Sequence, residues 1–104
     1  MTVMAGNLHK SLPSASIAAR KVIDKELVFC FSEPNVRLQR ALGFGGTKVV
    51  LGKDDRMIPK MGIAMPKSMN ALHLCHLDTK SMVTIALEIK NGAKKDVMYI
   101  TSIY

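Results

Sequence analysis

The stretch VTIALEIK at residues 83–90 decides the fold class, because its apolar side chains recur at every second position. Alternation with a period of two is the pattern of a β-strand that buries one face. Asn91-Gly92, a pair that favours tight turns between strands, follows it, and residues 97–104 form a second run rich in β-forming residues. The sequence therefore predicts an antiparallel hairpin here, with a loop near residues 91–96.

Further strands are predicted upstream of this hairpin. Residues 27–31 (LVFCF) are apolar at every position, which is typical of a central strand with both faces covered. Residues 47–51 predict another strand, and residues 71–77 are a strand candidate. Residues 57–65 are apolar but are interrupted by proline and glycine, so we expect a short edge strand or an irregular crossing there.

Two helices are predicted in the first half of the chain, after an irregular start over residues 1–12. Residues 14–25 place apolar side chains at three- and four-residue spacing, the pattern of an amphipathic helix. Residues 33–42 predict a second, short helix, because Ser32 suits its N-terminal cap and Gly43 suits its C-terminal end.

These elements define the expected fold class. The order of elements predicts an α+β fold in which one or two N-terminal helices pack on a four- to five-stranded, mostly antiparallel sheet ending in the C-terminal hairpin. The chain has 104 residues, of which 48% are apolar, and this is enough for one buried core. We therefore expect a single α+β domain over residues 1–104.

The expected compartment follows from hydropathy and cysteine usage. No stretch approaches the roughly 18 to 20 unbroken apolar residues of a membrane-spanning helix, so no membrane association is expected. The first ten residues, MTVMAGNLHK, do not resemble a secretory signal peptide. Cys30 and Cys75 both lie in apolar runs and are expected to be buried, reduced thiols, although a disulfide between them stays open. Together these features favour a cytoplasmic location.

The charge of the chain favours anionic partners. The formal net charge is +7, and residues 1–60 carry ten of the fifteen cations but five of the eight anions. Such a surplus suits nucleic acid, anionic lipid or an acidic protein, although a solvated basic surface would have the same composition. Cations that could form a stripe for binding phosphate groups are Arg37, Arg40, Lys48, Lys53, Arg56 and Lys60.

His73 and His76, which flank Cys75, are candidates for acid–base chemistry. An imidazole can take or give a proton near neutral pH, but both histidines could equally be structural. Three donors with no second cluster are too few for a structural zinc site, so neither a metal ion nor another cofactor is expected.

Ser102 and Tyr104 lie two residues apart and share one face of the last predicted strand. Two hydroxyl groups at this spacing can hold a phosphate, although such residues are also common at strand ends. The chain contains no phosphate-binding loop, no dinucleotide-binding glycine pattern, no zinc-protease motif and no plausible Ser-His-Asp set, which excludes nucleotide hydrolases, metalloproteases and α/β-hydrolases.

Two segments together resemble the nuclease domains of phage and polymorphic toxins in the barnase–EndoU–colicin–RelE superfamily. The first is VFCFSEPNVRLQRALGFGGTKVVL at residues 28–51, and the second is MVTIALEIKNGAKKDVMYITSIY at residues 82–104. Domains of this superfamily often end in a strand of the pattern apolar-x-Ser-x-Tyr. The match covers under half of the chain, and the histidine-bearing helix that is usual between the two segments is absent from the predicted elements.

The resemblance implies a small basic ribonuclease, acting as a toxin, that cleaves RNA without a metal ion. The 2′-hydroxyl group of the ribose would attack the neighbouring phosphate, which requires a base, an acid and cations. The candidate catalytic residues are His73, His76, Ser102, Tyr104 and Lys60, and the candidate RNA-binding residues are Arg37, Arg40, Lys48 and Arg56. An acidic immunity or antitoxin protein would be the expected partner.

Two alternatives stay open at the level of sequence. The chain could be a non-catalytic basic module, such as one encoded by a phage, that binds nucleic acid or serves as a protein adaptor. It could also be a structural subunit that associates through the flat C-terminal hairpin. The arrangement of the histidines, Ser102 and Tyr104 in space distinguishes these alternatives from the nuclease.

Overall fold

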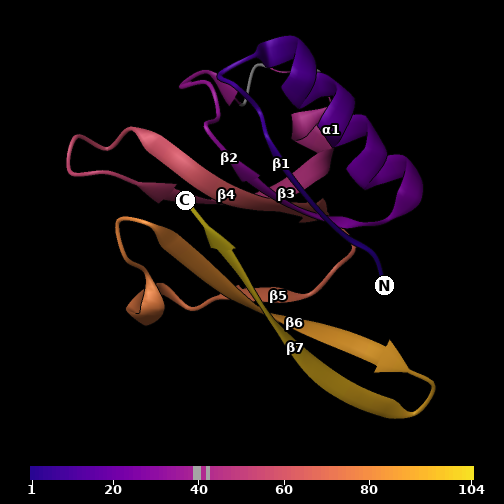
Figure 1. Ribbon diagram of the computed structural model, residues 1–104. Coiled ribbons are helices and arrows are strands. Elements are labelled where there is room, and N and C mark those ends of the chain that lie inside the picture. Colours follow the sequence, from indigo (N-terminus) through magenta and orange to yellow (C-terminus); the bar gives the residue numbers. More distant parts are fainter. Residues whose placement is uncertain (39–40, 42) are drawn as a thin grey trace.

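The computed structural model describes residues 1–38, 41 and 43–104, which form three layers (Figure 1). One α-helix covers one face of a four-stranded sheet, and a three-stranded sheet covers the other face. The α+β class and the C-terminal hairpin are confirmed, with the strands divided between two sheets.

Helix α1 spans Leu12–Lys25 and begins two residues before the predicted start. The Ser11 side chain accepts a hydrogen bond of 3.2 Å from the backbone N–H of Ser14, which satisfies one of the free donors of the first turn. The helix buries Ala15, Ala18, Ala19 and Val22 against the sheet. It packs closely because three of these four side chains are small.

The four-stranded sheet has the order β1-β2-β4-β3, with β1 at Val3–Asn7, β2 at Val28–Ser32, β3 at Thr47–Lys53 and β4 at Pro59–Pro66. β1 is parallel to β2, and the other neighbours are antiparallel. β2 is central, as its apolar residues predict. The prediction that residues 1–12 are irregular is wrong for β1, because Val3–Asn7 pairs with β2 along its whole length.

β4 is an interior strand, so the expectation of a short edge strand or an irregular crossing is wrong. Its prolines do not interrupt the pairing, because Pro59 and Pro66 are its first and last residues. Gly62 lies where a Cβ atom would stand 2.6 Å from the ring of Phe31 and 2.7 Å from the Val50 carbonyl oxygen. The residues that suggested a broken segment therefore allow the strand to fit between its neighbours.

The three-stranded sheet has the order β5-β6-β7, with β5 at Ala71–His73, β6 at Met82–Asn91 and β7 at Lys94–Ile103. β6 and β7 pair antiparallel over their whole length, which confirms the hairpin. The predicted strand at 71–77 is right for its first three residues, after which the chain forms a short 3-10 helix at Cys75–Leu77.

The predicted helix at 33–42 is wrong in the part of that segment that the structure describes. Ser32 is the last residue of β2 rather than a helix cap, and Glu33 has a φ of 51°, outside the helical region. Val36 and Arg37 lie in a turn, and a 3-10 helix follows at Phe44–Gly46.

Two apolar clusters separate the three layers. Phe29 and Phe31 of β2 point toward α1, whereas Val28 and the half-buried Cys30 point toward the three-stranded sheet. β2 therefore contributes to both clusters, which explains why its residues are apolar at every position. Among the described residues, no helix is long and apolar enough to cross a membrane.

Candidate functional site

The ends of β1 and β2 and the start of β4 lie together at one end of the four-stranded sheet. Because β1 and β2 are parallel, their carboxyl ends lie side by side, and antiparallel β4 begins beside them. Backbone hydrogen bonds run from Lys10 N to Glu33 O (2.7 Å) and from Glu33 N to Lys60 O (2.9 Å). They hold the segments after β1 and β2 against the start of β4.

A cavity of about 280 Å³ lies among these ends. Its polar and charged wall consists of Lys10, Glu33, Asn35, Lys60 and Tyr104, and its apolar wall comes from Pro34, Val36, Ile58 and Pro59. Tyr104 directly follows β7, so this residue comes from the three-stranded sheet. The cavity therefore forms where the two sheets meet.

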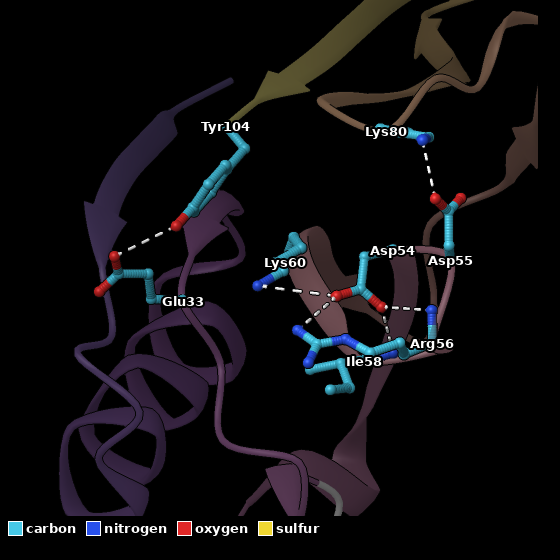
Figure 2. A network of polar contacts seen from close by, with 8 residues as sticks. All are labelled: Glu33, Asp54, Asp55, Arg56, Ile58, Lys60, Lys80 and Tyr104. Atoms are coloured by element: carbon cyan, nitrogen blue, oxygen red, sulfur yellow. Dashed lines mark hydrogen bonds and ion pairs between the residues drawn. The ribbon is translucent and has the colours of Figure 1, made fainter.

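Glu33 and Tyr104 face each other at this cavity (Figure 2). The Tyr104 hydroxyl donates a hydrogen bond of 3.4 Å to Glu33 Oε1. The Tyr104 backbone N–H donates to the Ser81 carbonyl oxygen at 2.7 Å, which holds the residue after β7 beside the start of β6. The arrangement places a carboxylate and a phenol at one opening.

The loop between β3 and β4 places Arg56 near Lys60, a residue of β4 that lines the cavity. Asp54 Oδ2 lies 3.4 Å from Arg56 and 3.8 Å from Lys60, as Figure 2 shows. Asp54 Oδ1 accepts hydrogen bonds from the backbone N–H groups of Ile58 (3.0 Å) and Arg56 (2.9 Å). The hydrogen bond from Ile58, with that from Arg56 and the two positive charges, lowers the pKa of Asp54 despite partial desolvation. Asp54 is therefore a fixed anion that orients Arg56 and Lys60.

An exposed ion pair of 2.7 Å between Lys80 and Asp55 links the same loop to the second sheet (Figure 2). Both groups are mostly exposed, so the pair contributes little stability on its own.

The structure brings together two of the five candidate catalytic residues, Lys60 and Tyr104. Ser102 lies instead in the interior, 3% exposed, where its hydroxyl donates to the Phe31 carbonyl oxygen at 3.5 Å. Ser102 is therefore buried and is not among the residues that line this cavity.

His73 and His76, both in the described part of the chain, are not among the residues that line the cavity. His73 ends β5, and its Nε2 atom lies 2.8 Å from the carboxylate of Asp78. His76 lies in the 3-10 helix and is exposed. The geometry of the cavity therefore gives no support to an acid–base role for either imidazole there.

The candidate RNA-binding residues do not form one stripe. Arg56 lies beside the cavity, and Arg37 is exposed one residue after Val36 of its wall. Lys48 lies toward the opposite end of β3 from that loop, where its ammonium group donates to the Met69 carbonyl oxygen. Arg40 lies outside the described residues.

Sequence reasoning missed Glu33, Lys10 and Asp54. For Glu33 the available signal was its place directly after the apolar run of β2. Glu33 was instead assigned to a helix. Among the described residues, no group of three or more histidine, cysteine, aspartate or glutamate side chains could hold a metal ion.

Both cysteines are free thiols, but they differ in exposure. Cys30 is half-buried, and its burial raises the pKa of its thiol. Cys75 is exposed, so its expected burial is wrong, because the chain leaves the sheet after His73.

Comparison with solved structures finds a similar fold in a nuclease. The endonuclease domain of TRAS1, a telomere-specific non-LTR retrotransposon, superposes with a TM-score of 0.73 at 22% sequence identity. The similarity covers 98% of this chain and 44% of that chain, so this chain spans less than half of its length. No protein-family model and no curated protein matches the sequence. The chain therefore shares the fold of part of that domain, and the resemblance to the barnase–EndoU–colicin–RelE superfamily gains no specific support.

Proposed function

We propose that the chain carries the phosphate-binding part of a nucleic-acid endonuclease, with the phosphate in the cavity between Glu33, Lys60 and Tyr104. The convergence of these three side chains from β2, β4 and β7 carries the proposal. The fold similarity to an endonuclease domain and the formal charge of +7 support it.

Each group has a role that its chemistry suits. The Lys60 ammonium group neutralises charge on the phosphate, and Arg56 beside it extends the positive surface toward the rest of the nucleic acid. The Tyr104 hydroxyl donates a hydrogen bond to a phosphate oxygen. The Glu33 carboxylate accepts a proton from the attacking hydroxyl group or water molecule. Substrate would replace the contact of 3.4 Å between Glu33 and Tyr104.

Metal-independent cleavage of RNA is one form of this proposal. In that form the nucleophile is the ribose 2′-hydroxyl group, which DNA lacks, so RNA alone would be cut. A toxin role, an acidic partner protein and a cytoplasmic location stay predictions.

The test is cleavage of labelled single-stranded RNA, single-stranded DNA and duplex DNA by the full chain, each with Mg²⁺ and with EDTA. We expect Glu33→Gln, which removes a positioned base, and Tyr104→Phe, which removes a hydrogen-bond donor to the phosphate, each to lower the cleavage rate by about 10²-fold or more. Glu88→Gln and Tyr99→Phe are matched controls, because both residues lie on the second sheet and do not line the cavity. Equal loss in the controls, or undiminished cleavage in the site variants, would contradict the proposed site.

Nucleic-acid binding without cleavage is the second candidate. It is favoured by the formal net charge of +7, which nucleic-acid binding alone would explain. It predicts no cleavage under any of the conditions above, together with binding that weakens as salt increases. Fluorescence anisotropy with labelled DNA and RNA measures the affinity at each salt concentration. Lys60→Gln should reduce the affinity for both nucleic acids.

A further inference from the structure

The segment after β5 holds a cysteine, a histidine and an aspartate in one chain of contacts, outside the cavity described above. Cys75 Sγ lies 3.5 Å from Nδ1 of His73. The other ring nitrogen of His73, Nε2, lies 2.9 and 2.8 Å from the two carboxylate oxygens of Asp78. The order thiol, imidazole, carboxylate is the arrangement of an activated nucleophile with a base and a group that orients the base.

The contact with Asp78 determines the tautomer of His73. An ionised carboxylate has no proton to donate, so Nε2 must carry the hydrogen that this contact requires. In the neutral imidazole, Nδ1 is then the atom with the free lone pair. That lone pair lies within reach of Cys75 Sγ, whose other nearby acceptor, the His73 carbonyl oxygen, is farther away at 3.7 Å.

The backbone holds the three side chains in place. Leu74 N donates to the Thr84 carbonyl oxygen, which holds the end of β5 against β6. The 3-10 turn is closed by hydrogen bonds from Leu77 N to Leu74 O (3.0 Å) and from Asp78 N to Cys75 O (3.1 Å). These bonds bring Asp78 back beside His73, although five residues separate them in sequence.

We propose that Cys75, His73 and Asp78 form a thiol-exchange site that reacts with low-molecular-weight disulfides such as oxidised glutathione. The Cys75 thiol gives its proton to Nδ1 of His73, and the sulfur attacks one sulfur of the disulfide. The disulfide bond of the small molecule breaks as the bond to Cys75 forms. The leaving thiolate takes the proton from His73, so the products are a mixed disulfide at Cys75 and one free small thiol.

Cys30 serves as an internal comparison. It is half-buried in β2, and burial disfavours its thiolate form. Cys75 is exposed and has a base beside it. The protein thus contains one half-buried thiol and one exposed thiol beside a base. We expect Cys75 to react faster than Cys30. This inference does not depend on the proposed nuclease function.

The test follows the reaction of the native chain with the disulfide reagent 5,5′-dithiobis(2-nitrobenzoate) at neutral pH. We expect one fast thiol, lost in Cys75→Ser and kept in Cys30→Ser. His73→Asn should slow that thiol by about tenfold, because its base is lost, and Asp78→Asn should slow it by less. His76→Asn is the matched control and should leave the rate unchanged. The imidazole that lies beside the Cys75 sulfur and the Asp78 carboxylate is that of His73, not that of His76.

Two further measurements separate activation from accessibility and from charge. The same chain unfolded in guanidinium chloride gives the rate of Cys75 without its partners, and native Cys75 should exceed it. The neutral reagent 2,2′-dithiodipyridine should show the same order of variants, because attraction of an anionic reagent to a basic protein cannot then contribute. Mass spectrometry after exposure to oxidised glutathione should find the adduct on Cys75.

The proposal fails if His73→Asn, shown to be folded by circular dichroism, reacts as fast as the wild type. If that variant does not fold, an unchanged rate in Asp78→Asn has the same meaning. It also fails if native Cys75 reacts no faster than in the unfolded chain.

Discussion

The two sheets of this protein differ in how much of their surface is covered. The four-stranded sheet lies between α1 and the second sheet, so β2 and β4 are buried on both faces. The three-stranded sheet is covered on one face, where Val83 and Ile85 are fully buried. Val97 and Tyr99 of β7 point to the uncovered face and are 57% and 69% exposed, and Met98, which shares the covered face with the buried Ile100, is still 39% exposed.

The difference shows that a regular strand pattern does not by itself determine burial. The hairpin β6–β7 pairs without interruption, but the first half of β7 extends past the layer that would cover it, as Figure 1 shows for the projecting turn. We therefore expect equal changes in side-chain size to have unequal effects in the two sheets. Val28→Ala and Val97→Ala, one substitution in each sheet, test this expectation.

The largest effect is expected at Gly62 in β4. A Cβ atom there would lie 2.7 Å from the Val50 carbonyl oxygen, and backbone in the middle of a sheet cannot easily move away. Gly62→Ala should lower the free energy of unfolding by about 3 kcal/mol. Gly45→Ala is the control, since no atom lies within 4 Å of its added Cβ, and it should change stability by less than about 0.5 kcal/mol. Urea unfolding followed by circular dichroism measures both, and equal values would contradict the crowded packing around β4.

A smaller effect is expected from one substitution made in each sheet. Val28→Ala removes two methyl groups from a fully buried position between the sheets and should cost about 2 kcal/mol. Val97→Ala removes the same groups from an exposed position and should cost less than about 0.5 kcal/mol. A comparable loss at Val97 in the same unfolding experiment would mean that the outer half of the hairpin is covered in solution.

The smallest effect is expected in the loop that joins β3 to β4. Because the pKa of Asp54 is lowered in the folded chain, its ionised carboxylate stabilises the fold above the usual pKa of 3.8, and this contribution is lost as the pH falls below that value. Asp54→Asn should therefore be less stable than the wild type at neutral pH, and the two should converge in acid. Asp55→Asn alters an exposed ion pair and should have little effect. Thermal unfolding across a pH series tests this, and a difference that grows in acid would have the wrong sign.

The sequence indicated part of the candidate site. Tyr104 was chosen for its place on the final strand and Lys60 for its charge, and the two lie at one cavity. Glu33 was missed because Ser-Glu-Pro is also a good start for a helix, and the left-handed backbone at Glu33 depends on contacts with Lys10 and Lys60, which are distant in sequence. Ser102 has the right alternation to share a face with Tyr104, but that face is covered before the strand ends.

The sequence by itself determined the elements whose signal is local. Helix α1 follows from apolar spacing, the hairpin β6–β7 from alternation and a turn pair, and the central place of β2 from its continuous apolar run. Tertiary structure alone decided that β1 is a strand, that β4 lies inside the sheet, and that the strands divide into two layers. The physical reason is that these features depend on pairing between distant segments, and a strand on a sheet edge or one bounded by prolines carries little of that information in its own residues.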